Sequence, residues 1–139
     1  MSSLSPLAAT ANVALGGAIG AALRYQLGRA MTHWLGVKTI TTFPWATLTA
    51  NVLGSLCMGL LAGWMARQGT GGEQVRLLLG VGLLGGFTTF SSFGLDVLEL
   101  CQGGQFAKAG LYVLASNAVG LLAVWGGYEI AQRFAVTHT

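Results

Sequence analysis

The amino-acid sequence predicts an all-α integral membrane protein with four transmembrane helices, the third of them broken in mid-membrane. Only 8% of its 139 residues are charged and 53% are hydrophobic, whereas a soluble domain carries about 25% charged residues. The charges separate apolar stretches that are each long enough to cross hydrocarbon about 30 Å thick. We therefore expect one four-helix transmembrane unit over residues 1–139, with spans at roughly 8–31, 44–66, 76–100 and 108–133.

The first two spans are bounded by charges and by residues typical of helix ends. The first positive charge is Arg24, so the N-terminal stretch lacks the basic region of a cleaved signal peptide and is expected to remain as a span. The second span begins at Pro44, which suits a first helical turn. Trp45 and Trp64 would lie about 28 Å apart on a helix, as expected for two interfacial belts.

The third span is unusual in its middle. Its uncharged run extends from Leu77 to Leu95, and within it Gly85 and Gly86 remove side-chain support. Four hydroxyl residues then offer the backbone competing hydrogen bonds: Thr88, Thr89, Ser91 and Ser92. Irregular backbone at membrane depth persists only where it is packed in protein or lines a wet cavity. We therefore predict an interrupted helix over residues 85–93, at a polar site.

The fourth span completes a unit with short connections, at about 33–43, 68–74 and 102–107. Small residues four positions apart recur in every span and allow helix backbones to approach closely. These pairs are Gly16 and Gly20, Gly59 and Gly63, Gly82 and Gly86, and Ser116 and Gly120. Four helices make too thin a bundle to enclose a generous pore, so association of protomers is expected.

Positive charges divide almost evenly between the two ends of the predicted bundle. Four spans place both termini on one side, which then carries three positive residues against four on the other. The two sets are Arg67, Arg76 and Arg133 against Arg24, Arg29, Lys38 and Lys108. The positive-inside rule needs an asymmetry to set orientation. The balance favours a dual-topology protein that forms antiparallel homodimers; alternatively, a signal other than charge fixes one orientation.

The spans lack the residues that enzymes and nucleic-acid-binding proteins need. All four acids lie at span ends or in loops: Glu73, Asp96, Glu99 and Glu129. No carboxylate pair, nucleophile–base pair or metal cluster can be drawn within the membrane, and the net charge of +3 is too small and scattered for a nucleic-acid surface. The pattern Gly80-x-Gly82-x-x-Gly85 matches a dinucleotide fingerprint, but that motif needs a strand–turn–helix context.

The predicted spans instead carry hydroxyls, amides and phenyl rings. Thr47 and Asn51 share one face of the second span, as Tyr112 and Ser116 do on the fourth. Singly, each is more often structural, because hydroxyls usually bond their own backbone and Asn often only ties helices together. Their alignment with an interrupted helix favours a polar pathway without fixed charge.

Three phenylalanines, Phe87, Phe90 and Phe93, interleave with the hydroxyls of the third span. Alone they would indicate packing. The edge of a phenyl ring is electropositive, so rings set between hydroxyls favour a small anion without holding it tightly. Uncoiled backbone carbonyls at residues 85–88 could separately coordinate a cation, as in other membrane sites.

The stretch Gly85-Gly-Phe-Thr-Thr-Phe-Ser-Ser-Phe93 strongly resembles the signature of the Fluc (CrcB) fluoride channels. Gly16-Gly-Ala-Ile-Gly-Ala-Ala-Leu-Arg-Tyr25 and Thr47-Leu-Thr-Ala-Asn-Val-Leu-Gly54 resemble this family on the first two spans, so the resemblance covers essentially the whole chain. It implies an antiparallel dual-topology homodimer in the inner (plasma) membrane whose two pores export fluoride passively.

The resemblance also implies roles for residues at matching positions. Phe90 and Phe93 would meet fluoride with their ring edges, and Asn51 would be the pore amide. The hydroxyls along the fluoride pathway would be those of Thr47, Ser91, Tyr112 and Ser116.

Further positions match the family's vestibule and its cation site. Arg24 and Asp96 would line the vestibule, and the backbone carbonyls of Gly85 and Thr88 would hold a structural Na⁺ at the dimer centre. Three positions depart from the family's pattern: Asp96 in place of Glu, Gly94 in place of Ser, and Gly120 where some members have a pore-lining Ser.

Two other functions compete with a channel. A dual-topology four-span small-molecule transporter coupled to protons needs an acid embedded in the membrane, and no acid lies in any predicted span centre. A membrane assembly subunit would account for the glycine pairs but not for the interrupted polar span.

Overall fold

The computed structural model describes residues 4–68 and 72–134, and these residues form helices and short connections. Four stretches are long and apolar enough to cross a membrane: Pro6–Leu35, Trp45–Arg67, Glu73–Gln102 and Phe106–Arg133. The helices are α1 (Pro6–Leu35), α2 (Val37–Thr42), α3 (Trp45–Gln68), α4 (Glu73–Val75), η2 (Arg76–Leu84), α5 (Gly85–Phe87), α6 (Phe90–Gln102) and α7 (Phe106–Arg133).

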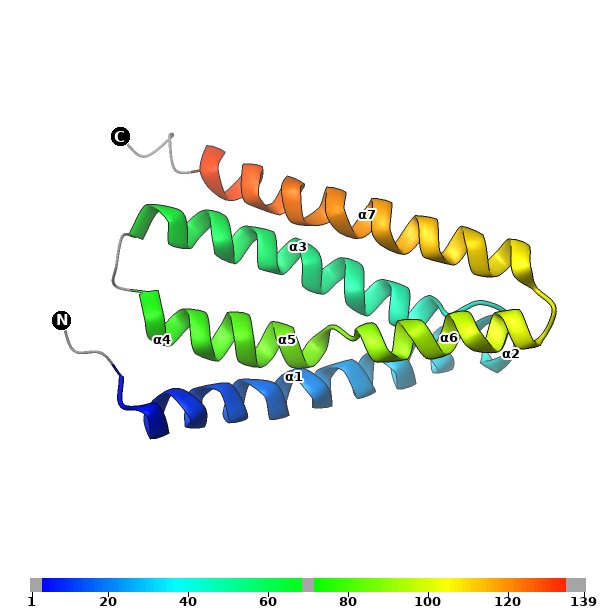
Figure 1. The fold of residues 1–139 in the computed structure, drawn as a ribbon, viewed down its shortest axis with the longest axis horizontal. Helices are drawn as coiled ribbons and strands as arrows, with labels where there is room; N and C mark the ends of the chain where they lie inside the picture. Colours follow the sequence, from blue (N-terminus) through cyan, green and yellow to red (C-terminus); the bar gives the residue numbers. More distant parts are fainter. Residues whose placement is uncertain (1–3, 69–71, 135–139) are drawn as a thin grey trace.

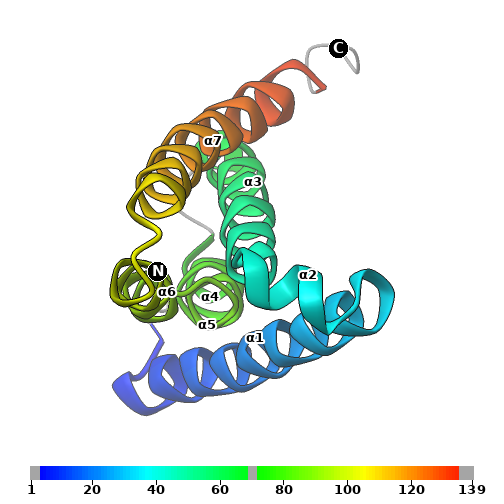
Figure 2. The ribbon, with the colours of Figure 1, turned by 90° about the vertical axis from the view of Figure 1, so that its right-hand side faces the viewer.

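The four long stretches lie side by side, with the start of α1 and the end of α7 at the same end of the molecule (Figure 1). Viewed end-on, α3 and α7 form one layer, α1 crosses below it, and the column from α4 to α6 lies in the angle between them (Figure 2). The main packing contacts are those of α3 with α7 and of α1 with η2 and α5.

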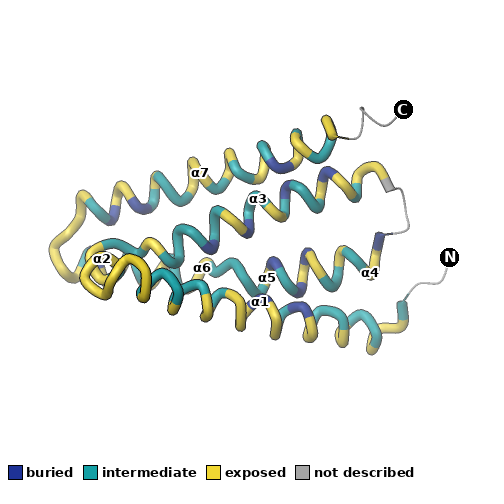
Figure 3. Tube along the Cα trace, turned by 180° about the vertical axis from the view of Figure 1, so that it is seen from behind, coloured by how far each residue is buried: buried dark blue, intermediate teal, exposed yellow. Residues whose placement is uncertain are grey.

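The connection after the first span, predicted as a short one at about 33–43, is largely helical. The hydrophobic stretch of α1 continues as helix to Leu35, and Gly36 then turns the chain with a φ of 81°, which glycine adopts readily. The next six residues form α2, which is exposed along most of its length (Figure 3). In the second predicted connection, 68–74, residues 69–71 lie outside the described part of the chain.

Glycines bring the helix backbones into contact at the two main packing interfaces. A side chain at Gly20 would collide with the Leu83 carbonyl oxygen, and one at Gly59 would collide with the Val124 carbonyl oxygen. The expected close approach at these small residues is therefore confirmed for α1 and α3. Gly120, of the pair Ser116 and Gly120, makes no such approach within the described part of one chain, because a Cβ there would meet only the Ser55 hydroxyl, at 3.8 Å.

A cluster of buried side chains lies beside the second half of the third span. Tyr112 is 0% exposed and clusters with Leu100 and Ala109. Phe93 and Phe43 pack against this cluster. Large apolar side chains elsewhere, particularly on α7, remain exposed, which suits a surface that faces lipid.

Candidate functional site

The third span loses its helical backbone at two adjacent threonines. The backbone of Thr88 (φ −80°, ψ 157°) and of Thr89 (φ −152°, ψ 116°) is extended, between the end of α5 and the start of α6 at Phe90. The nine residues Arg76–Leu84 that lead to this point are π-helical, a conformation found frequently at functional sites. Both extended residues lie within the predicted stretch 85–93.

The two threonines satisfy the backbone on either side of the interruption. The Thr88 backbone N–H and the Thr88 hydroxyl each donate to the Leu84 carbonyl at 3.0 Å, so the first half of the span ends in bonded groups. The Thr89 hydroxyl accepts from the Ser92 backbone N–H at 3.2 Å, which is the usual bond of a threonine that precedes a helix. The interruption is thus capped from both sides by its own side chains.

A side chain on α3 holds the extended backbone. The Asn51 amide nitrogen donates to the Thr89 carbonyl at 3.0 Å, and the Thr89 N–H donates to the Asn51 Oδ1 at 2.7 Å. In an unbroken helix that N–H would bond the carbonyl of Gly85, four residues earlier. Gly54, one turn along α3, permits the contact, because any Cβ there would collide with the Thr88 methyl group. Asn51 therefore takes the place of a helical hydrogen bond.

A line of hydroxyls runs from the interruption towards α1. The Thr89 hydroxyl lies 3.3 Å from the Ser91 hydroxyl and donates to the Ser92 hydroxyl at 3.1 Å. Arg24, on α1, donates to the same Ser92 oxygen at 3.5 Å. The buried Arg24 Nε has no hydrogen-bond partner among the described residues. A positive charge therefore lies beside the start of α6.

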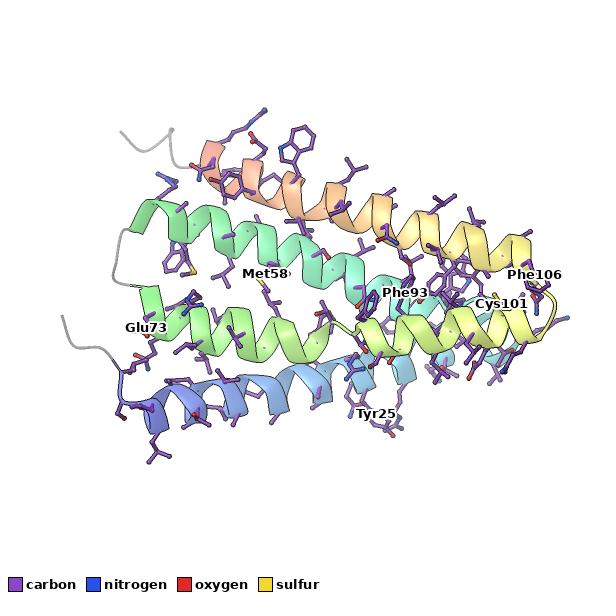
Figure 4. All side chains as sticks on the ribbon, viewed as in Figure 1. Tyr25, Met58, Glu73, Phe93, Cys101 and Phe106 are labelled. Atoms are coloured by element: carbon purple, nitrogen blue, oxygen red, sulfur yellow. The ribbon has the colours of Figure 1, made fainter. Side chains whose placement is uncertain are left out.

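Aromatic rings line the opposite side of α6. The Phe93 ring centroid lies 5.6 Å from that of Phe90 and 5.2 Å from that of Tyr112. Phe43 meets Tyr112 edge-on at 5.5 Å. Phe93 extends from α6 towards α3 and α7 (Figure 4). Phe90 is 83% exposed, so the single chain leaves one of the two predicted fluoride-facing rings uncovered.

Tyr112 is the centre of a second polar group. Its hydroxyl donates to Asp96 Oδ2 at 2.9 Å, and the hydroxyls of Thr47 and Ser116 also lie near the phenol. Ser116 Oγ is buried and has no hydrogen-bond partner among the described residues. Asp96 therefore reaches the predicted pathway directly, despite being shorter than the Glu that the family resemblance leads one to expect.

Two cavities flank the ring cluster. One of about 280 Å³ is lined by Asn51, Phe90 and both extended threonines. The other, of about 360 Å³, is lined by Thr47 and Asp96 on the side of Tyr112. The seven predicted pathway residues are distributed over this region. Asn51 and Ser91 contact Thr89, and Thr47 and Ser116 lie near the Tyr112 hydroxyl. The rings of Phe90 and Phe93 follow one another towards Tyr112.

The two residues of the predicted cation site, Gly85 and Thr88, lie at the two ends of the short helix α5. Gly85 is the first residue of α5, three residues before Thr88. No group of three or more His, Cys, Asp or Glu side chains that could hold a metal occurs in the described ranges. A Cβ at Gly94 would meet open space.

Sequence reasoning placed Thr89 and Ser92 among the hydroxyls of the interrupted span but did not predict that they form a helix cap. It missed the site roles of Gly54 and Glu99. The pair Thr89 and Ser92 has the spacing of a helix cap, which could have been recognised in the sequence. Gly54 has a role only because Thr88 lies against it, and Glu99 lines the 360 Å³ cavity only through the packing of α6 against α3. The sequence alone carries no signal for these two.

Known proteins resemble this chain over most of its length. Residues 11–128 match the family described as CrcB-like protein, Camphor Resistance (CrcB). The chain is 54% identical over 136 residues to the fluoride-specific ion channel FluC of Erythrobacter litoralis, across 97% of this chain and 100% of the relative. It is 50% identical to the protein of that name from Novosphingobium aromaticivorans, across 93% and 100% of the two chains. For the protein of that name from Sphingopyxis alaskensis the identity is 51%, across 87% and 93%.

Proposed function

Because the chain belongs to the CrcB family of fluoride-specific ion channels, we propose that fluoride crosses the membrane at the interruption of its third span. The protein is a multi-pass channel of the plasma membrane and not an enzyme. The observation that carries the proposed path is the two-bond contact of Asn51 with Thr89, which fixes polar backbone in a cavity that the exposed Phe90 ring also lines.

The path runs between the two cavities, past the rings of Phe93 and Tyr112. On one side it begins where Thr47 and Asp96 line the 360 Å³ cavity. On the other it reaches Asn51 and Phe90 in the 280 Å³ cavity. Between the cavities the anion meets hydroxyls and the edges of phenyl rings. These edges are electropositive and attract the anion weakly. Conduction requires that release be as easy as entry, and the uncharged groups between the cavities meet that requirement. The Asp96 carboxylate lines the cavity where the path begins.

The buried Ser116 hydroxyl supports a donor role along this path. Burying a hydroxyl without a partner costs free energy, and the Ser116 Oγ finds none among the described residues. An anion passing Tyr112 would supply that partner. The Tyr112 hydroxyl, which donates to Asp96, would be shared between the carboxylate and the passing ion.

Asn51 both shapes the path and donates to the anion. A carboxamide nitrogen carries two hydrogens, and one of them is engaged by the Thr89 carbonyl. The Thr89 N–H fixes the oxygen of the same group, so the amide cannot flip. The second hydrogen is the donor that we assign to fluoride. A fixed donor, rather than an acceptor, then faces the 280 Å³ cavity.

A second copy of the chain in antiparallel orientation would complete the path. Phe90 is 83% exposed in one chain and lines an open cavity, so a partner is needed to enclose an ion beside it. The near balance of positive residues between the two ends supports an antiparallel arrangement. Two such chains would form two pores, which export fluoride down its gradient.

A structural Na⁺ at the centre of this dimer is the remaining part of the proposal. The Thr89 N–H bonds Asn51, which leaves the Gly85 carbonyl without the helical partner it would otherwise have. Thr88 has extended backbone beside it. Carbonyl oxygens of unwound helix suit such a cation. The cation would supply positive charge at the point where two interrupted spans meet.

The path can be tested with one ring substitution and its matched control. Phe93→Ile should abolish fluoride efflux from liposomes, because it removes the ring edge between Phe90 and Tyr112. Phe106→Ile changes an exposed ring at the start of α7 and should conduct as the wild type does. Size-exclusion chromatography should show dimers for both variants. Wild-type efflux through Phe93→Ile would remove this ring from the path.

A further inference from the structure

A third cavity, of about 750 Å³, lies at the end of α1 and has no part in the proposed path beyond its contact with Arg24. Its walls come from the last turns of α1, from α2 and from Ala46 at the start of α3. Two of its wall residues, Gly28 and Gly36, face open space, since a Cβ at either would meet no atom of the described residues within 4 Å. Gly16 and Gly20, earlier on the same helix, instead contact the third span closely. The later glycines therefore leave room on this helix face rather than packing it.

The polar side chains of this cavity favour an anion. Arg24, Arg29 and His33 line it, and none of the described residues that do so is acidic. The acids at this end, Asp96 and Glu99, line the neighbouring 360 Å³ cavity instead. Two guanidinium groups and an imidazole can together donate several hydrogen bonds to one group with several oxygens. The acceptor that suits these donors is therefore a group with several oxygens, which is larger than a single halide ion.

The position of the cavity along α1 matches the depth of lipid headgroups. The helix has 30 residues and is therefore about 45 Å long, which exceeds the hydrocarbon thickness of about 30 Å. Trp34 is 77% exposed beside the cavity, as is typical of residues at a membrane interface. Tyr25 points away from the bundle (Figure 4), and Val37 is likewise exposed. These side chains offer apolar walls next to the cationic group.

We propose that this cavity binds the phosphate of an anionic phospholipid headgroup, with Arg29 and His33 as its main donors. Basic pockets between membrane helices bind such headgroups, and this cavity lies between α1, α2 and the start of α3. Arg24 forms the inner wall and remains bonded to Ser92. The acyl chains lie along Tyr25 and Val37, towards the bilayer. The lipid would thus bind next to the fluoride path without entering it, and its binding does not depend on conduction.

Native mass spectrometry of the purified full-length protein tests this proposal. Detergent-solubilised protein is mixed with phosphatidylglycerol or phosphatidylcholine, and retained lipid is counted for the wild type and for Arg29→Gln/His33→Gln. The control is Arg76→Gln, which removes an exposed cation at the other end of the bundle. A juxtamembrane cation contributes about 1 kcal/mol to anionic lipid binding, so the double variant should retain phosphatidylglycerol roughly fivefold to tenfold less. The control should match the wild type.

Several results would overturn the proposal. Equal retention of phosphatidylglycerol by the double variant and the wild type would exclude Arg29 and His33 as its donors. Equal retention of the two lipids by the wild type would remove the preference for an anionic headgroup. Complete displacement of the lipid by millimolar inorganic phosphate would assign the cavity to free phosphate. Separation of the dimer in the double variant would mean that a second copy of the chain fills it.

Discussion

Replacing Asn51 with Leu tests the contact that holds the interruption open. Leu has a similar size but cannot bond Thr89, so the substitution removes the bonds of 3.0 and 2.7 Å. The Thr89 N–H and carbonyl are then left without these partners at a depth where no bulk water replaces them. Each unsatisfied group costs about 1–3 kcal/mol, so the native geometry is weakened by roughly 2–6 kcal/mol in total.

The expected effect on conduction follows from that cost. If only 2 kcal/mol of it appears in the barrier to fluoride passage, the flux falls about thirtyfold, since about 1.4 kcal/mol corresponds to a factor of ten. Asn51→Asp keeps an oxygen for the Thr89 N–H but loses the donor and adds a negative charge to the path. It should therefore conduct no better than Asn51→Leu. Fluoride efflux from liposomes, normalised to reconstituted protein, measures both.

The chain provides a matched control for this substitution. Asn117 is exposed, and among the described residues its amide donates only to the Val113 carbonyl of its own helix, at 2.8 Å. Asn117→Leu should therefore keep fluoride efflux within about twofold of the wild type, because solvent- or lipid-exposed substitutions of this kind usually change stability little. If Asn51→Leu conducts as well as Asn117→Leu, with both proteins dimeric, the contact of Asn51 with Thr89 has no role in forming the path.

Two further substitutions test other parts of the account. Tyr112→Phe removes the hydroxyl that bonds Asp96 and that we assign to the passing ion. A hydrogen bond to a charged group is worth about 1.5–3 kcal/mol, so fluoride efflux should fall by about tenfold to a hundredfold. Unchanged efflux would mean that the hydroxyl is not a ligand. Gly20→Ala places a methyl group against a carbonyl of the third span and should destabilise the protein by about 1–3 kcal/mol, whereas Gly110→Ala faces open space. Thermal unfolding in detergent compares the two alanine variants, and equal midpoints would contradict the packing argument.

The number of membrane-spanning helices could be predicted from the sequence, because the bilayer constrains it strongly. Charged residues cannot easily lie in hydrocarbon, so their positions divide the chain into spans, and the four apolar helices agree with that division. The helix Val37–Thr42 was missed, because six residues carry too little periodicity to distinguish a short helix from a loop.

The site was predicted in composition but not in its hydrogen bonding. The comparisons confirm the resemblance to fluoride channels, and the two extended threonines lie in the stretch that glycine and hydroxyl residues had singled out. The bonds between Asn51 and Thr89 join positions 38 residues apart, so no local pattern encodes them. The π-helical conformation of Arg76–Leu84 could not be predicted from hydropathy either, because hydropathy does not distinguish one helical hydrogen-bond pattern from another.

The central claim, a fluoride-selective path through this chain, is tested most directly by ion efflux from liposomes that contain only the purified protein. Fluoride and chloride are loaded in parallel, and their loss is followed with ion-selective electrodes. The account predicts rapid loss of fluoride while chloride is retained. Retention of both ions by well-folded dimers, or loss of both at the same rate, would contradict it.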